Sequence, residues 1–238
     1  MGNAAAVLFL SGALGLAAQA GADDCSYQAR RDQRLDAAGV RTLRVIARAG
    51  SLRIDGQAGA SAIDVHGTAC AGREATLNDI QVRIRRSGSE ATVEAEIPDT
   101  FNWLGGGEAR LDLVLEVPPG VSVEVEDGSG EVHIRNVAAA KVSDGSGEMV
   151  LEAIAGEVRI TDGSGGIEVR DVGSVVIEED GSGGISISGV RGNVTVRDDG
   201  SGSIAVRDVA GDFTVQDDGS GGITHAAVRG RVRVPSRD

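Results

Sequence analysis

The chain has 238 residues, with 36 glycines, only 2% aromatic residues and a formal net charge of −13. This length allows one large domain or two small ones, and the scarcity of rings beside many Val and Ile residues suggests a thin, layered core. Lys141 is the only lysine among 23 basic residues. Because phosphate binding needs clustered cations, this composition argues against a nucleic-acid partner.

Residues 1–22 have the pattern of a secretory signal peptide. They carry no charged side chain, and an apolar stretch over residues 7–16 is followed by small residues that fit cleavage after Ala20 or Ala22. The stretch is too short to span a bilayer comfortably, and no later segment reaches the apolar length of a membrane helix. We therefore expect a bacterial protein that is exported to the periplasm, associated with the outer envelope, or secreted.

Cys25 and Cys70 are the only two cysteines in the chain. In an oxidising compartment, a pair without a third partner most simply forms one disulfide. A metal site is the weaker alternative, because neither cysteine has a His or a second Cys at ligand spacing. The sequence therefore predicts a Cys25–Cys70 disulfide that ties the start of the exported chain to its first strands.

Residues 23–126 are predicted to form an N-terminal β cap with irregular first coils. Leu52 with Ile54, and Ile63 with Val65, alternate as expected for strands of one degenerate coil. Residues 79–97 and 109–126 are predicted to be longer strands, and the Pro118–Pro119 pair is placed at a bend, where a missing N–H costs no ladder bond.

Residues 127–238 contain six copies of the sequence D-G-S-G. The copies begin at spacings of 17, 18, 18, 19 and 19 residues, at Asp127, Asp144, Asp162, Asp180, Asp199 and Asp218. Between copies, short runs alternate apolar and polar residues, as in Ile185 with Ile187 and Val194 with Val196. Self-similarity at a fixed period indicates units that stack only on their neighbours. The prediction is a single-chain parallel β-solenoid of about 18-residue coils, with right-handed winding as the default.

The D-G-S-G sequence is predicted to be the corner of each coil. Its Asp can accept a hydrogen bond from the N–H of the Ser two residues on, and its glycines can supply positive φ angles. A second corner is predicted at a separate series of glycines: Gly156, Gly173, Gly192, Gly211 and Gly230.

The order of these segments resembles a known group. The opening "AGSLRIDG", the "IQVRI…ATVEAEIP" hairpin, the "VLEVPPGVSVEVEDGSG" transition and the D-G-S-G repeats are similar to the bacterial "putative adhesin" family of β-strand-repeat proteins of unknown function. The resemblance covers roughly residues 40–234. It implies an envelope-associated solenoid, and it supplies no catalytic residue to transfer.

Stacking would bring the six D-G-S-G aspartates to about 4.8 Å from one another, the spacing of neighbouring strands. Four further acids, Glu126, Glu179, Asp198 and Asp217, lie beside them in the sequence and would join them along one edge. Two interpretations stay open. The aspartates can serve purely as turn residues, or they can be weak calcium ligands, although calcium needs six to eight oxygens.

Nothing in the sequence indicates catalysis. The serines of the repeat are not a singular nucleophile, no G-x-S-x-G turn occurs, and His66, His133 and His225 are scattered. One segment that does not repeat, residues 98–109, carries Phe101 and Trp103, and aromatic residues there can mark a partner contact or cover an apolar edge.

We therefore expect a non-enzymatic structural or binding module of the bacterial envelope, without a firm cofactor. Its ligand is expected to be a glycan or a protein, and self-association is possible. The first alternative is a calcium-dependent adhesion module that uses the D-G-S-G carboxylates. A polysaccharide-acting enzyme is a distant third, because the coils vary too little in length to build a cleft.

Overall fold

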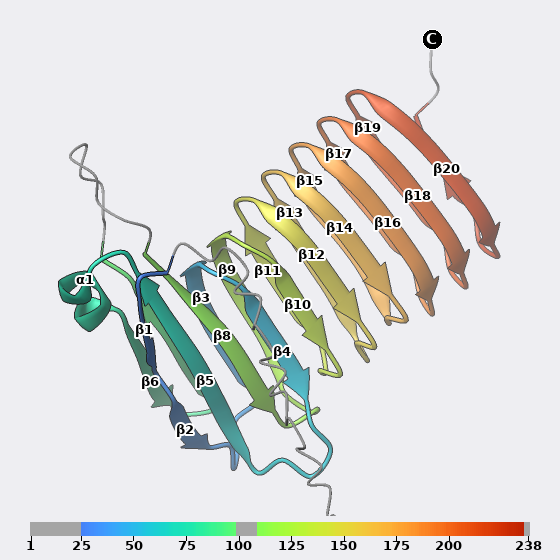
Figure 1. Cartoon of the computed structure of the whole chain (residues 1–238). Coiled ribbons are helices and arrows are strands. Elements are labelled where there is room, and N and C mark those ends of the chain that lie inside the picture. The colour runs from blue at the N-terminus through green and yellow to red at the C-terminus, as the bar shows by residue number, and fades with distance from the viewer. Residues whose placement is uncertain (1–24, 99–108, 236–238) are drawn as a thin grey trace, which may run out of the picture.

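A computed structural model describes residues 25–98 and 109–235 of the chain. Over these residues the protein is a β-solenoid in which each regular coil gives one strand to each of two sheets (Figure 1). The strands of sheet A follow the order β1-β5-β8-β4-β10-β12-β14-β16-β18-β20, with β2 also paired to β5. Those of sheet B follow the order β21-β19-β17-β15-β13-β11-β9-β3-β7-β6. The predicted all-β parallel solenoid is confirmed.

The regular coils alternate between the two sheets along the chain. In sheet A they contribute β10 (Val132–Arg135), β12 (Gly147–Glu152), β14 (Gly165–Arg170), β16 (Gly183–Val190), β18 (Gly202–Val209) and β20 (Gly221–Val228). In sheet B they contribute β9 (Ser122–Ser129), β11 (Ala140–Asp144), β13 (Glu157–Asp162), β15 (Ser174–Asp180), β17 (Val194–Asp199), β19 (Phe213–Asp218) and β21 (Val232–Arg233).

The core consists of aliphatic ladders, as the alternating pattern predicts. Ile185 pairs in register with Ile204, and Ile204 with Ile223, across three successive coils. Ile185 and Ile204 are each 1% exposed, whereas Ile223 in the last coil is only partly buried. Each coil thus buries its inward residues against the coil before and the coil after it, and the polar residues between them face outward.

The N-terminal cap lies at the end of the stack opposite to the last coil, β20 and β21. Its strands β1 (Tyr27–Arg30), β2 (Gln33–Asp36) and β5 (Ala62–Ala71) add to sheet A, and β5 pairs antiparallel with β1, β2 and β8 (Ala109–Val117). In sheet B, β6 (Gln81–Ser87) and β7 (Glu90–Glu96) form the predicted antiparallel hairpin. Helix α1 (Glu74–Asp79), which the sequence pattern did not indicate, lies at this end (Figure 1).

The first coil of the chain is not the first coil of the stack. Strands β3 (Thr42–Ala49) and β4 (Leu52–Gly56) form this coil, and β3 lies between β7 and β9 while β4 lies between β8 and β10. All four of these pairings are parallel. After its first coil, the chain therefore forms the cap on one side of that coil. Strands β9 and β10 then continue the stack on the other side.

The expected coil of residues 52–65 is corrected by this arrangement. Leu52 and Ile54 do lie in a coil, but Ile63 and Val65 belong to the antiparallel cap strand β5. Period-two alternation is the same in both settings, so it could not separate them.

In the described ranges, no helix is long and apolar enough to cross a bilayer.

Candidate functional site

The D-G-S-G sequence forms the corner between sheet B and sheet A. In the later copies its Asp is the last residue of a sheet B strand, and its final Gly is the first residue of the next sheet A strand. The final glycines pair in register from coil to coil: Gly147 with Gly165, Gly165 with Gly183, Gly183 with Gly202, and Gly202 with Gly221. The corner is therefore a continuous stack of identical turns.

The final glycine of the corner has no room for a side chain. At Gly183, φ is +147°, and a Cβ atom would lie 1.6 Å from the carbonyl oxygen of Gly165 in the preceding coil. At Gly202, φ is +151°, and the same contact with Gly183 would be 1.5 Å. Both the dihedral angle and the close approach of two backbones require glycine here.

The first glycine of the corner is required for only one of these reasons. At Gly181 the φ angle is outside the left-handed region, but a Cβ atom would lie 2.3 Å from the carbonyl oxygen of Gly163. The N–H of Gly181 donates to the carbonyl oxygen of Asp162 at 3.1 Å. The expectation that both glycines supply positive φ is thus corrected, because the first one permits close packing between coils.

The second corner also uses glycine for close packing. Gly173 and Gly192 have φ angles outside the left-handed region, and a Cβ atom on either would lie within 2.9 Å of a backbone oxygen of the preceding coil. The left-handed residues of this corner come a few positions earlier and are mostly not glycine: Asn136, Ala153, Asp171, Gly189, Asp208 and Ala227.

The D-G-S-G aspartates point into the molecule. Asp144 is 6% exposed, Asp162 is 2%, and Asp180 and Asp199 are each 1%. Asp127 and Asp218, in the outermost copies, are partly exposed. Stacking is as expected, since Asp144 pairs with Asp162 and the series continues in register to Asp218. The expected edge of ten acids is corrected to an inward column, which we name the aspartate ladder and which comprises these six residues.

The expected turn contacts to these carboxyls occur in the first three copies, where the N–H groups of the following Gly and Ser, such as Gly145 and Ser146 beside Asp144, lower the pKa of the carboxyl against the effect of burial. In the later copies, both carboxyl oxygens of Asp180 and Asp199 lack a hydrogen-bond donor within the described residues. In the first copy, the N–H of Gly128 donates to Oδ1 of Asp127 at 2.9 Å. The corner is also held by backbone bonds between coils, such as Gly200 N–H to the carbonyl oxygen of Asp180 at 2.8 Å.

Burial raises the pKa of these carboxyls, because removing them from water disfavours the charged form. The pKa of Asp180 rises to about 7, through burial first and then through the neighbouring Asp199 and Asp162. The pKa of Asp127 rises to about 6, again mainly through burial. Burial also raises the pKa values of Asp144, Asp162 and Asp199, with repulsion from ladder neighbours adding to the effect at the last two.

The four acids predicted beside the ladder are separate from it. Glu126, Glu179, Asp198 and Asp217 are all exposed, on the opposite side of the strand from the core. Glu126 forms an ion pair with Arg44, whose guanidinium donates to the Glu126 carboxylate at 2.5 Å. Within the described ranges, no three His, Cys, Asp or Glu side chains gather as a group able to hold a metal ion.

Ion pairs that join neighbouring coils cover the outer faces of the middle coils. On sheet A, Arg170 contacts Glu152 of the preceding coil at 3.0 Å. On sheet B, Glu178 lies between Arg159 and Arg197, with the Arg197 contact at 2.6 Å. These charges face one another across coil boundaries, so they are satisfied within the protein.

The outer face of the last three coils of sheet A has a different character. Small side chains and one arginine stack there in two columns: Ser186, Ala205 and Thr224 in one, and Ser188, Arg207 and Ala226 in the other. Arg207 is the single charged member. We name these six residues the small-residue face. It carries a shallow hollow of 240 Å³ lined mainly by residues of these columns.

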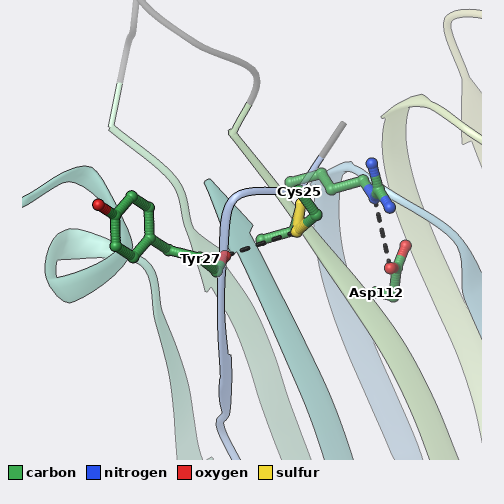
Figure 2. The surroundings of a disulfide bond; sticks show 5 residues. Cys25, Tyr27 and Asp112 are labelled. Atoms are coloured by element: carbon green, nitrogen blue, oxygen red, sulfur yellow. Dashed lines mark hydrogen bonds and ion pairs between the residues drawn. A yellow bond between two sulfur atoms is a disulfide. The ribbon is translucent and has the colours of Figure 1, made fainter. Parts of the chain in front are cut away.

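The predicted disulfide is present in the structure. Cys25 and Cys70 are bonded, with their Cα atoms 5.5 Å apart. Figure 2 shows the bond beside Tyr27, whose carbonyl oxygen is 3.5 Å from Sγ of Cys25. Cys70 is 1% exposed within β5, so the bond fixes the beginning of the described chain to the cap.

The remaining candidate residues do not converge on one site. His66 lies near Asp32 at 3.5 Å, His133 lies between Arg53 and Glu152, and His225 takes the register position of Val206 in the last coil. Phe101 and Trp103, the proposed contact residues, lie outside the described residues.

No family model matches the chain, and no curated protein matches it. Solved structures with a similar arrangement include a "putative adhesin" from Bacteroides fragilis, at 11% identity and a TM-score of 0.39, covering 90% of this chain and 100% of that one. A "putative adhesin" from Parabacteroides merdae has 7% identity and a TM-score of 0.37, covering 89% of this chain and 97% of that one.

A third structure is a "putative cell adhesion protein" from Clostridium sporogenes. It has 10% identity and a TM-score of 0.31, and the match covers 87% of this chain and 99% of that one. No site residue is transferred from these structures to this chain.

Proposed function

We propose that this protein is an exported, non-enzymatic module of the bacterial envelope that binds an extended polysaccharide through the small-residue face. The observation that carries this proposal is the register of that face. Ser186, Ala205 and Thr224 follow one another on adjacent strands, so each coil offers the next sugar units a similar contact. Repetition matters because individually weak contacts combine when ligand and surface both repeat.

The chemistry of the face suits a glycan. Ser186 and Thr224 are exposed; Ser186 offers a hydroxyl group, Thr224 offers the oxygen of a hydroxyl that donates to the carbonyl oxygen of Ile204 at 3.4 Å, and Arg207 offers several N–H donors on the neighbouring column. All of these side chains except Arg207 are short, so a chain of sugar rings can lie flat across the strands beside it. Export is supported by the Cys25–Cys70 disulfide, because such bonds persist in oxidising compartments.

Co-sedimentation with insoluble peptidoglycan tests the proposal, with cellulose as a second polymer. Ala205→Arg places a long charged side chain in the middle of the face and should weaken sedimentation at least tenfold. Thr195→Arg makes the same change on the outer face of sheet B and serves as the matched control. Equal sedimentation of both variants and the unchanged protein, or sedimentation of none of them with either polymer, would contradict this function.

Calcium dependence of this contact stays a prediction. Repeating the sedimentation with calcium and with a chelator tests it. A contact that needs calcium would favour the alternative of a calcium-dependent adhesion module.

A further inference from the structure

The middle members of the aspartate ladder, from Asp144 to Asp199, are acids buried away from water. Asp180 and Asp199 are each 1% exposed, and their carboxyl oxygens have no hydrogen-bond donor among the described residues. Buried charges are normally paired or else become neutral, because an isolated charge inside a protein is costly. The Asp180 and Asp199 carboxyls therefore need either a positive partner or a proton.

The charged groups that face the ladder are themselves acids. Asp180 faces Asp162 and Asp199, and Asp199 faces Asp180, Asp218 and the exposed Asp198. The end of the ladder nearest the cap is similar, since Asp127 and Asp162 both face Asp144.

The strands packed against the ladder bring no compensating charge. On sheet A, the strands that follow the last five corners begin with glycine. Arg48 of β3 lies in register with Asp127, but it is exposed, and its side chain is 4.0 Å from Glu94.

Neighbouring carboxyls approach closely enough to share a proton. Asp180 lies in register with Asp199, and Asp199 with Asp218, on neighbouring strands about 4.8 Å apart, and each carboxyl shifts the pKa of the next. If one carboxyl of such a pair takes a proton from solvent, its O–H can donate to the carboxylate of the next coil. This single step removes one buried charge, ends one repulsion and supplies one missing donor.

We propose that the aspartate ladder is a proton-binding site, in which stacked carboxyls of neighbouring coils share protons across the coil boundary. The ligand is the proton itself, taken up from solvent near neutral pH. The Asp180–Asp199 pair is the principal site, because both members are almost fully buried. Bound protons join coil to coil in the interior, in addition to the backbone ladders.

Carboxyl-carbon NMR titration of the whole protein between pH 4 and pH 9 tests this proposal. At least one buried carboxyl should titrate two or more pH units above an ordinary aspartate. That resonance should disappear in Asp180→Asn, Asp199→Asn or both. Asp198→Asn removes the exposed acid next in sequence and should leave the high titration in place. If every aspartate of the unchanged protein titrates below pH 5, the proposal is wrong, whatever the variants do.

A metal cation is the competing occupant, and calcium alone is the probe. The NMR titration is repeated with millimolar calcium at constant ionic strength. Under the proton proposal, the high titration moves by less than half a pH unit. A calcium-dependent loss of the high titration that is absent in Asp180→Asn would show that the ladder holds a metal ion instead.

Discussion

At the scale of single residues, the corner is defined by what it excludes. Gly183 sits where a side chain would collide with the backbone of the preceding coil. At its neighbour Gly184, the atom nearest to an added Cβ would be Oγ of Ser203, at an ordinary contact distance of 3.9 Å. The two glycines are adjacent in sequence and belong to the same strand, β16. Only the first is required by the fold.

We therefore predict that Gly183→Ala destabilises the protein by about 3 kcal/mol or more, because it adds both a steric clash and an unfavourable φ angle. Gly184→Ala is the matched control and should change the free energy of unfolding by less than about 0.5 kcal/mol. Denaturant unfolding of both variants measures the difference. Equal stability of the two variants would show that the corner backbone can relax.

For two of the six aspartates, the sequence pattern alone could have predicted that the side chain points inward. In β11, Ala140 and Val142 face the core, so period-two alternation places Asp144 on the same side. β13 repeats the pattern with Asp162. In β15 and β17 one extra residue precedes the Asp, and the pairing of β13 with β15 shifts register at that point. The extra residue hid the inward direction of Asp180 and Asp199.

At the scale of elements, the cap depends on links that are distant in sequence. The disulfide joins residues 45 positions apart. Asp55, at the end of β4, accepts hydrogen bonds from Arg135 and from Nδ2 of Asn136, the latter at 3.0 Å. This contact holds the first coil of the chain to the coil that follows the cap. Neither the coil order nor this contact has a local signal, because both arise from strands that meet only after folding.

Removing the disulfide should loosen the cap before the regular coils. We predict that Cys25→Ser with Cys70→Ser costs on the order of 3 to 4 kcal/mol, as loop-closure entropy implies for a loop of this length. Hydrogen exchange should become faster in β1 and β5 while β14 and β16 keep their protection. Uniformly faster exchange along the chain would instead show that cap and coils unfold as one unit.

At the scale of the whole molecule, the protein combines a repeating interior with outer faces that differ along the stack. The fold could be predicted from the period of the repeat, because each coil obeys the same local pattern. The candidate binding face could not be predicted from the sequence. The sequence does not show that charged residues of the middle coils pair with one another, or that small residues stay exposed on the last three coils. The ladder adds a pH-dependent contribution to the stability of the stack.

The sign of that contribution follows from the pKa directions. Raised values mean that folding favours the protonated carboxyl, so the stabilisation is complete below about pH 4 and is lost as pH rises through the folded values. Those pKa values are about 6 for Asp127 and about 7 for Asp180. Asp55 acts in the opposite sense. Burial raises its pKa, but hydrogen bonds from Arg135 and Asn136 lower the pKa overall. The stabilisation from Asp55 is therefore present above about pH 4 and is lost as the pH falls below that value.

The most direct test of a proton-binding interior is therefore the melting temperature of the unchanged protein between pH 5 and pH 8 at constant ionic strength. The ladder predicts that the melting temperature is highest near pH 5 and falls steadily towards pH 8, with the steepest change between pH 6 and pH 7.5. A melting temperature that stays flat, or that rises, from pH 5 to pH 8 would show that the ladder does not hold protons in the folded protein.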